Sequence, residues 1–357
     1  MKFVIATGGS GGHLFPSIQV AQELDRCGHD IVFLGSFNRT NDQMQRTGFT
    51  YEDLNAKGLV LAPSKESVRS LIAMAKAISK AFRSLRKIKP DAVLGFGGYG
   101  AFPVVFSAVV LRVPALIHEQ NVVPGRANAL LSKFVPRVAV SFAKSLKYFN
   151  TKRTILTGCP CKSPREKMDR AEILKGFHLA QGKTTILIMG GSQGSQRINE
   201  VALGAIRSLK ERLDVQVIHL SGKQGYQNYK DQYDLLGIPF ALFEFLDKME
   251  EAYCAADLVI SRAGAVTVSE IASFQLPAIL IPYPYARGHQ RENASVLCGS
   301  RLSRIIEDKE LSASILAESV LALLAQPLSA EERNEQYKDV CIPDAAQRLA
   351  EEAIKLR

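Results

Sequence analysis

Two glycine-rich stretches hold the residues best suited to binding a phosphate. The first is KFVIATGGSGGH at Lys2–His13, and the second is TILIMGGSQG at Thr185–Gly194. Each stretch combines an apolar run, a loop containing GGS and the start of a predicted helix. Glycine lets the backbone approach a ligand closely, and the N–H groups at a helix start favour an anion. We therefore expect one phosphate-binding loop in each half of the chain.

Two further motifs follow later apolar runs of the first half. One is GFGGYGAFP at Gly95–Pro103, in which Gly97 and Gly98 could cradle a second phosphate and Tyr99 could stack on a ligand. The other is HEQN at His118–Asn121. Ligands bind at the carboxyl ends of parallel strands, which favours a binding role for these residues, with loop capping as the alternative interpretation.

In the second half, RAGAVTVSE at Arg262–Glu270 contains a Thr267…Glu270 spacing with two interpretations. The spacing fits a capping box at the start of a helix. Alternatively, Glu270 binds a vicinal diol such as a ribose, because each carboxylate oxygen can accept one hydroxyl. The later segment Tyr283–Ala294 is rich in donors and acceptors, which suits a sugar.

Strand-length apolar runs alternate with helix-length periodic segments, which predicts an α/β protein with parallel sheets. The last strand predicted in the first half is Val138–Ser141, and residues 151–164 are predicted to connect the halves. Pro277–Pro282 is the last strand predicted in the second half, and Ala345–Leu356 is a predicted final helix. A chain of 357 residues accommodates two domains.

The net charge of +10 is unevenly distributed. Residues 1–157 contain 21 basic and 9 acidic residues, whereas residues 158–357 contain 24 and 26. This asymmetry indicates an anionic partner for the first half. The most basic segment, Lys65–Lys89, has apolar residues at helical spacing, including Leu71 and Met74. It predicts a helix that packs on the sheet, or one that also rests on anionic lipid through an exposed Leu71–Met74 end.

Several classes of protein are excluded or disfavoured. No apolar run reaches the 18 to 20 residues, roughly, that span a bilayer, and no signal peptide is evident. Six scattered cysteines favour reduced thiols over a metal site, and only Cys159 and Cys161 lie close together. Nucleic acid is not expected as a partner, because no recognised motif is present.

Six motifs together resemble the MurG family of peptidoglycan N-acetylglucosaminyltransferases. They are GGSGGH, GFGGYGAFP, HEQN, GGSQG, RAGAVTVSE and HQRENA, in this order over nearly the whole chain. The resemblance implies the GT-B fold, with two Rossmann-like α/β domains whose parallel sheets face a cleft. It also implies an inverting transfer of N-acetylglucosamine from UDP-GlcNAc to lipid I, which gives lipid II for peptidoglycan synthesis.

The same resemblance implies a division of labour between domains. Residues 1–157 plus 340–357 are expected to form the acceptor and membrane-associated domain, and residues 158–339 the UDP-GlcNAc domain. The expected partners are UDP-GlcNAc, lipid I and an anionic membrane surface, at the cytoplasmic face of the inner membrane as a peripheral protein. No cofactor and no metal are expected, and no DxD-like acidic pair follows a predicted strand.

Residue by residue, the resemblance assigns His13 as the general base. It assigns the phosphates to Ser192, the uracil to Leu246, the ribose to Glu270 and the sugar hydroxyls to Gln290. The full set of implied donor-binding residues is Ser10, Gly11, Gly12, Asn121, Lys162, Ser192, Leu246, Ala265, Val266, Thr267, Val268, Ser269, Glu270 and Gln290. Gly97, Gly98 and Tyr99 are expected to form the acceptor or phosphate loop.

Two positions depart from the family pattern. GCPCK at Gly158–Lys162 stands where the family commonly has GNPVR, so Lys162 keeps the charge and lacks the planar fork of arginine. His289 stands where some members have a second glutamine.

In the implied chemistry, the helix dipole at His13 disfavours the imidazolium form and keeps the ring available as a base, and the alternative is a histidine that only caps or packs. Loop amides at Ser192 and the helix after Gly264 would stabilise the leaving phosphates.

Three other functions compete with this one. The first is another GT-B enzyme, either a different UDP-sugar transferase or a UDP-sugar epimerase. The second is a dinucleotide-dependent oxidoreductase, which is weakened because GGSGGH lacks the G-x-G-x-x-G spacing and Asp30 lies too close to the loop. The third is a membrane scaffold without catalysis, which gives no reason for two phosphate loops.

Overall fold

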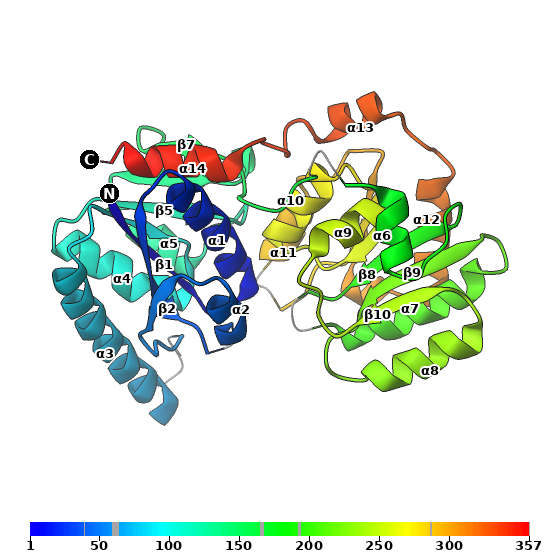
Figure 1. Cartoon of the computed structure of the whole chain (residues 1–357), viewed down its shortest axis with the longest axis horizontal. Helices are drawn as coiled ribbons and strands as arrows, with labels where there is room; N and C mark the ends of the chain where they lie inside the picture. Colours follow the sequence, from blue (N-terminus) through cyan, green and yellow to red (C-terminus); the bar gives the residue numbers. More distant parts are fainter. Residues whose placement is uncertain (39, 59–63, 165–167, 192–193, 286–287, 357) are drawn as a thin grey trace. The chain divides into compact units, whose positions relative to one another are not determined.

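The computed structural model describes residues 1–38, 40–58, 64–164, 168–191, 194–285 and 288–356 (Figure 1). It divides into two compact units, the first formed by Met1–Cys161 with Ile342–Arg357 and the second by Lys162–Cys341. Each unit contains one wholly parallel sheet covered by helices, so the predicted α/β architecture is confirmed. No helix among the described residues has the length and apolarity that crossing a membrane requires.

The first unit has a seven-stranded sheet in the order β3-β2-β1-β4-β5-β6-β7. Its strands are β1 (Lys2–Gly8), β2 (Asp30–Ser36), β3 (Thr50–Asp53), β4 (Ala92–Gly95), β5 (Ala115–Glu119), β6 (Arg137–Val140) and β7 (Thr154–Leu156). Its helices are α1 (Gly11–Arg26), α2 (Asn41–Arg46), α3 (Lys65–Ile88), α4 (Gly98–Val110), α5 (Arg126–Leu131), the 3₁₀ helix η1 (Ala143–Tyr148) and α14 (Ala345–Ile354).

Both faces of this sheet are buried, which explains its nearly continuous apolar strands. Along β1, Phe3 and Ile5 pack with α1 and α14, whereas Val4 and Ala6 pack with α3 and α4 (Figure 1). Strand order reverses at β1, because β2 lies on one side of it and β4 on the other. Ligands of doubly wound sheets bind beyond the strand ends at such a switch point.

The second unit has a six-stranded sheet in the order β10-β9-β8-β11-β12-β13, with its switch point at β8. Its strands are β8 (Thr184–Met189), β9 (Val215–Leu220), β10 (Phe240–Phe243), β11 (Leu258–Ser261), β12 (Ala278–Leu280) and β13 (Ser303–Ile305). Its helices are α6 (Arg170–Gly176), α7 (Gln196–Leu209), α8 (Tyr226–Leu236), α9 (Met249–Ala255), α10 (Ala265–Ser273), α11 (His289–Ala294), the 3₁₀ helix η2 (Asp308–Glu310), α12 (Ala313–Leu324) and α13 (Ala330–Tyr337). Helices α7, α8 and α12 contribute to one large buried cluster on this sheet.

The structure corrects two predicted sheet edges. Residues 151–164 are not only a connection, since Thr154–Leu156 pairs with β6 as a seventh strand. Likewise, Pro277–Pro282 does not contain the last strand of the second half, because Ser303–Ile305 pairs with β12. Both missed strands are three residues long and none of their residues is fully buried, so they lack the long apolar run that marks a central strand.

The predicted basic helix is present as α3, with its buried face slightly rotated from the predicted one. Met74 is 7% exposed and belongs to the packed face, together with Ala77 and Ala81. The predicted exposed end is therefore correct for Leu71, which is 63% exposed, and wrong for Met74.

Candidate active site

The three motifs of the first unit meet at its switch point. The loop after β1 carries Ser10, Gly11, Gly12 and His13 into α1, and the loop after β4 carries Gly97 to Tyr99 into α4. Ser10 is the N-cap of α1, its side chain makes no capping hydrogen bond, and it is exposed together with Gly12. The first N–H groups of an α-helix have no acceptor within the helix, so this helix start can bind an anion.

Glycines allow these loops to touch. Gly8 has φ +129°, and a Cβ there would lie 2.2 Å from the Ser36 carbonyl oxygen. Gly98 has φ +74°, and a Cβ there would lie 3.0 Å from both the Gly8 carbonyl oxygen and His13 Cδ2. The ring of Tyr99 lies against Gly9, since a Cβ on Gly9 would be 2.9 Å from Tyr99 Cε1. The structure therefore brings Gly98 and Tyr99 onto the first loop, where a side chain would separate them.

His13 is half-buried in the first turn of α1, and its ring contacts residues from two other elements. Its Nδ1 lies 3.2 Å from Gln120 Oε1, just beyond β5. Gln120 Nε2 in turn donates to the Phe96 carbonyl at 3.0 Å and lies 3.2 Å from His118 Nδ1. Burial lowers the pKa of His118 to about 4, so this second ring is neutral at pH 7.

Glu119 organises the segment that follows β5. Its buried carboxylate accepts from the Asn121 backbone N–H at 2.9 Å, the Asn121 side-chain amide at 3.0 Å and the Gly125 N–H at 3.0 Å. Asn128 donates to the same carboxylate at 2.9 Å. The loop-capping interpretation of HEQN therefore describes Glu119, and the same contacts fix where Asn121 lies.

In the second unit, the glycine loop after β8 leads into α7 at the switch point. Gly190 lies directly against the backbone of Gly194 and Ser195, since a Cβ on Gly190 would be 2.2 Å from the Ser195 nitrogen. Ser195 is the N-cap of α7, and its side chain accepts from the Ile198 N–H. Ser192, the residue predicted to bind the phosphates, lies outside the described residues, so its place in this loop stays a prediction.

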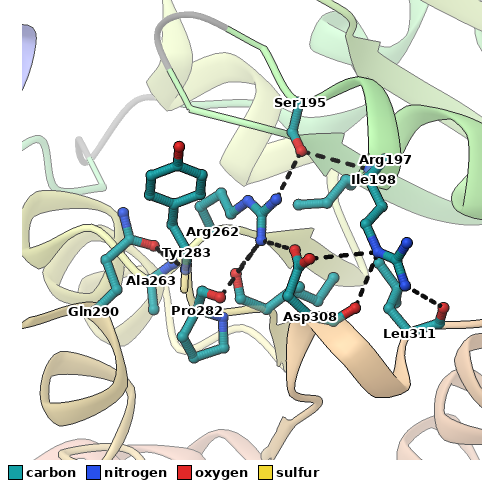
Figure 2. Close-up of polar contacts among 11 residues, drawn as sticks. Ser195, Arg197, Ile198, Arg262, Ala263, Pro282, Tyr283, Gln290, Asp308 and Leu311 are labelled. Atoms are coloured by element: carbon teal, nitrogen blue, oxygen red, sulfur yellow. Dashed lines mark hydrogen bonds and ion pairs between the residues drawn. The ribbon is translucent and has the colours of Figure 1, made fainter. Parts of the chain in front are cut away.

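A buried arginine connects this loop to the strand ends beside it. Arg262 is 9% exposed, and its Nη2 donates to Ser195 Oγ at 3.0 Å while Nη1 donates to the Ile281 carbonyl at 3.2 Å (Figure 2). Nη1 also pairs with Asp308 Oδ1 at 2.5 Å, and Arg197 Nε lies 3.4 Å from the other oxygen of that carboxylate. Two guanidinium groups share one carboxylate, so the cluster keeps one positive charge beside the α7 start.

The capping-box interpretation of Thr267…Glu270 is wrong. Helix α10 begins at Ala265 with Gly264 as its N-cap, so Thr267 lies inside the first turn. Glu270 instead accepts from the Tyr253 hydroxyl at 2.9 Å. Burial raises the pKa of Glu270 to about 7, and the hydrogen bond from Tyr253 acts in the opposite direction. Above this pKa the carboxyl group is ionised and can accept hydrogen bonds, and its binding of a ribose diol stays a prediction.

The remaining predicted donor residues lie on segments around Glu270 and Arg262. Lys162 Nζ pairs with Glu250 Oε2 at 2.5 Å and donates to the Asp247 carbonyl at 3.2 Å. It therefore anchors the segment that contains Leu246, which is half-buried and lies just beyond β10. Gln290 Oε1 accepts from the Tyr283 N–H at 2.9 Å and from the Ala263 N–H at 3.2 Å.

These two bonds fix the orientation of the Gln290 amide. Because Oε1 is occupied by backbone donors, the side-chain NH₂ is the end that can reach a sugar hydroxyl. Among the described residues, no cluster of three histidine, cysteine or acidic side chains could hold a metal ion.

Sequence reasoning did not single out three residues that shape these sites. Gln120 and Arg262 lie inside quoted motifs, yet no role was predicted for either. Tyr253 lies in α9, outside every motif, and reaches Glu270 only because α9 packs near α10. For Arg262, the available signal was a basic residue directly after an apolar, strand-length run, which forms β11 beside β8.

Two family models match the chain. The glycosyltransferase family 28 N-terminal domain matches residues 3–140, and the C-terminal domain matches residues 185–349. The chain belongs to glycosyltransferase family 28. Its GT-B fold and its transferase activity class, both expected from the six motifs, are confirmed by these matches.

Members of family 28 with similar sequences are named for one and the same enzyme. The UDP-N-acetylglucosamine–N-acetylmuramyl-(pentapeptide) pyrophosphoryl-undecaprenol N-acetylglucosamine transferase of Halothermothrix orenii is 37% identical, covering 91% of this chain and 90% of that protein. The enzyme of the same name from Bacillus subtilis is 32% identical over 98% of both chains.

Solved structures show the same fold. Acinetobacter baumannii MurG has a TM-score of 0.75 and 28% sequence identity, covering 99% of both chains. The UDP-GlcNAc 2-epimerase of Neisseria meningitidis has a TM-score of 0.68 at 16% identity, which is a likeness of fold alone.

Proposed function

We propose that this family 28 enzyme transfers N-acetylglucosamine from UDP-GlcNAc to lipid I, the undecaprenyl-pyrophosphoryl-MurNAc-peptide, and so makes lipid II. The observation that carries the proposal is the match of more than nine-tenths of the chain, at 31% to 37% identity, to relatives named for this reaction. An epimerase of the same fold is not favoured, because its likeness to the chain rests on fold alone.

In this proposal the second unit binds the donor. The start of α7 and the Arg262 cluster supply positive potential for the diphosphate, Glu270 accepts the ribose hydroxyls, and Gln290 donates to the sugar. As UDP leaves with the electron pair of the glycosidic bond, the helix start stabilises the growing negative charge. No bound metal is needed for this step, because the amides and the guanidinium cluster perform it.

The first unit binds the acceptor and supplies the base. A sugar hydroxyl of lipid I gives its proton to His13, its oxygen attacks the anomeric carbon of the donor, and the configuration inverts. The glycine loop at Gly97 to Tyr99 adjoins His13, and in this proposal its backbone N–H groups bind the acceptor diphosphate. Membership of family 28 and the close approach of His13 to Gln120 and Gly98 support this arrangement.

The direct test is transfer of labelled N-acetylglucosamine from UDP-GlcNAc to a lipid I analogue, with and without a chelator. We expect transfer with inversion that survives chelation. Tight UDP-GlcNAc binding with no transfer to this acceptor, or conversion of the free donor to its 2-epimer, would contradict the proposal.

The raised pKa of Glu270 predicts that donor affinity falls at acidic pH. Its value of about 7 lies above the ordinary 4.5, so the carboxylate is protonated below pH 7 and one acceptor oxygen of the diol site is lost. The KM for UDP-GlcNAc should rise by up to about tenfold per pH unit below 7. Steady-state kinetics between pH 5.5 and 8.5 would measure this, because the donor diphosphate keeps its charge there.

Two variants separate this effect from a general loss of activity. Glu270→Gln should raise KM by about 10- to 100-fold at pH 8 and flatten its pH dependence, because charged hydrogen bonds are lost. Tyr253→Phe removes a hydrogen bond that stabilises the ionised form of Glu270. The pH below which the KM begins to rise should therefore be higher in this variant. Glu335→Gln, an exposed control on α13, should match the native enzyme; an unchanged profile in Glu270→Gln would refute the assignment.

The surface of the first unit supports an association with anionic membrane. Helix α3 exposes Val68, Leu71 and Ile72 at 61%, 63% and 51%, and α4, which packs beside it, exposes Val110 at 55%. Lysines and arginines of α3 border these apolar side chains. Amphipathic helices with this pattern bind at the lipid interface through apolar burial and attraction to anionic headgroups.

We therefore expect the double variant Leu71→Glu/Ile72→Glu to bind anionic phosphatidylglycerol vesicles at least about tenfold more weakly, since two large apolar side chains no longer enter the interface. Vesicle sedimentation measures this binding. Leu235→Glu, at an 87% exposed position of the second unit, is the matched control and should bind normally. Equal loss in both variants would contradict the proposed surface.

A further inference from the structure

The residues that surround His13 carry an inference about how its proton is placed. His118, Gln120 and His13 form an unbroken series of hydrogen-bonding groups within the first unit, and this series ends at the carbonyl of Gly158. Each group in the series restricts the next, because a carbonyl oxygen can only accept a hydrogen bond and a neutral imidazole has one donor and one acceptor.

The restriction begins at His118. Its Nε2 lies 3.0 Å from the Gly158 carbonyl oxygen, so Nε2 must carry the hydrogen. This side chain is fully buried and neutral at pH 7, which leaves Nδ1 as an acceptor. Ser141 Oγ, 3.3 Å from the same Nε2, is compatible with this tautomer because a hydroxyl can accept.

Gln120 is restricted next. Its Nε2 lies 3.0 Å from the Phe96 carbonyl oxygen and 3.2 Å from His118 Nδ1, and both of these groups are acceptors. Turning the amide over would place its oxygen against a carbonyl and a lone pair. The amide is only 2% exposed, so no bulk water is available to relieve such a conflict. The NH₂ group therefore faces inward and Oε1 faces His13.

We propose that Gln120 is a positioning residue that holds His13 in the Nδ1–H tautomer, with the Nε2 lone pair directed at the Gly98 loop. Oε1 accepts from His13 Nδ1 at 3.2 Å. Nε2 is on the far side of the ring, 3.2 Å from where a Cβ of Gly98 would lie. Glycine at 98 therefore leaves room beside the nitrogen that takes the proton.

The choice of an amide has a consequence of its own. A carboxylate at this position would also select the Nδ1–H tautomer, and its negative charge would stabilise the imidazolium as well. The neutral Gln120 selects the tautomer without adding that charge. The base is thus oriented by a series of hydrogen bonds and not by a buried acid. The catalytic part of this inference rests on the proposed function.

Nitrogen NMR of the imidazole rings tests the tautomer without any substrate. The chain has six histidines, so ¹⁵N-histidine labelling gives few signals, and His13→Gln identifies the one of interest. With the ring neutral, we expect the protonated-type signal at Nδ1 and the lone-pair-type signal at Nε2. A native His13 with its proton on Nε2 would overturn the proposal, whether or not any variant folds.

The matching variant is Gln120→Met, which keeps the length of the side chain and removes the acceptor. We expect the Nε2–H form of His13 to appear and kcat to fall roughly 10- to 100-fold, with both KM values changed less than about threefold. Gln347→Met, at an exposed position of α14, should change neither the tautomer nor kcat. A retained Nδ1–H signal with full kcat in Gln120→Met would overturn the proposal.

The two hypotheses fail in different ways. If His13 has the Nδ1–H tautomer and loses it in Gln120→Met, while the native protein transfers nothing to lipid I, the proposed function is wrong and the positioning role stands. If transfer occurs and the tautomer is the opposite one, the positioning role is wrong.

Discussion

Replacing His13 by alanine is expected to lower kcat by about 10²- to 10⁴-fold, the range that a positioned general base contributes. The acceptor hydroxyl is a weak nucleophile until its proton is removed, and water cannot replace an oriented imidazole beside the Gly98 loop. The KM for UDP-GlcNAc should change less than kcat, because the donor contacts proposed for the α7 start, Glu270 and Gln290 belong to the second unit. Transfer to a lipid I analogue at saturating concentrations of both substrates measures the effect.

A control histidine makes this result specific. His29 is half-buried and directly precedes β2. It therefore lies at the amino-terminal ends of the strands, whereas the switch-point loops follow the carboxyl ends. His29→Ala should therefore retain kcat within a few-fold. If His13→Ala kept the native rate, the histidine would only cap or pack, which is the alternative interpretation of this position.

Removing the Arg262 side chain is expected to have the largest effect on stability. Arg262→Met removes one of the donors to Ser195 Oγ and the Arg262 bond to the Ile281 carbonyl, and it leaves Asp308 with Arg197 alone (Figure 2). Removing one partner of a buried ion pair typically lowers the free energy of unfolding by about 3 to 5 kcal/mol. Because Arg197 still pairs with Asp308, we expect a loss of about 3 kcal/mol here. For a domain of this size the melting temperature should fall by about 6 to 12 °C.

Thermal and urea unfolding of the variants measure this loss. The matched control is Arg212→Met, which breaks an exposed pair with Glu318 on the same unit and should cost less than about 1 kcal/mol. Adding Asp308→Asn to Arg262→Met should recover part of the stability, because the incompletely paired carboxylate is then gone. Equal losses for Arg262→Met and Arg212→Met would contradict the structural role of this cluster.

The central strands and glycine loops could be predicted from sequence because their signals are local. Strands buried on both faces are continuous apolar runs, as β8 (Thr184–Met189) and β9 (Val215–Leu220) show. A glycine loop that follows such a run marks a strand end. The edge strands β7 and β13 could not be predicted, because pairing with a neighbour, and not their own composition, makes them strands.

A local sequence pattern also fails to predict the structure where the same residue spacing is compatible with two different local structures. Thr267…Glu270 fits a capping box, yet the N-cap of α10 is Gly264, three residues before Thr267, and Glu270 accepts a hydrogen bond from Tyr253. Similarly, Met74 and Leu71 belong to the same predicted apolar stripe of α3. The packing of this helix buries Met74 and leaves Leu71 exposed.

The sequence by itself determined the family, the two-unit α/β architecture and the motifs that hold the candidate site, because these depend on residue type and short spacing. The tertiary structure alone decided the partners of the reactive groups. His13 meets Gln120 across 107 positions, and Lys162 meets Glu250 across 88. The tautomer of a histidine and the charge state of a carboxyl group depend on such neighbours, which only the folded chain brings within hydrogen-bonding distance.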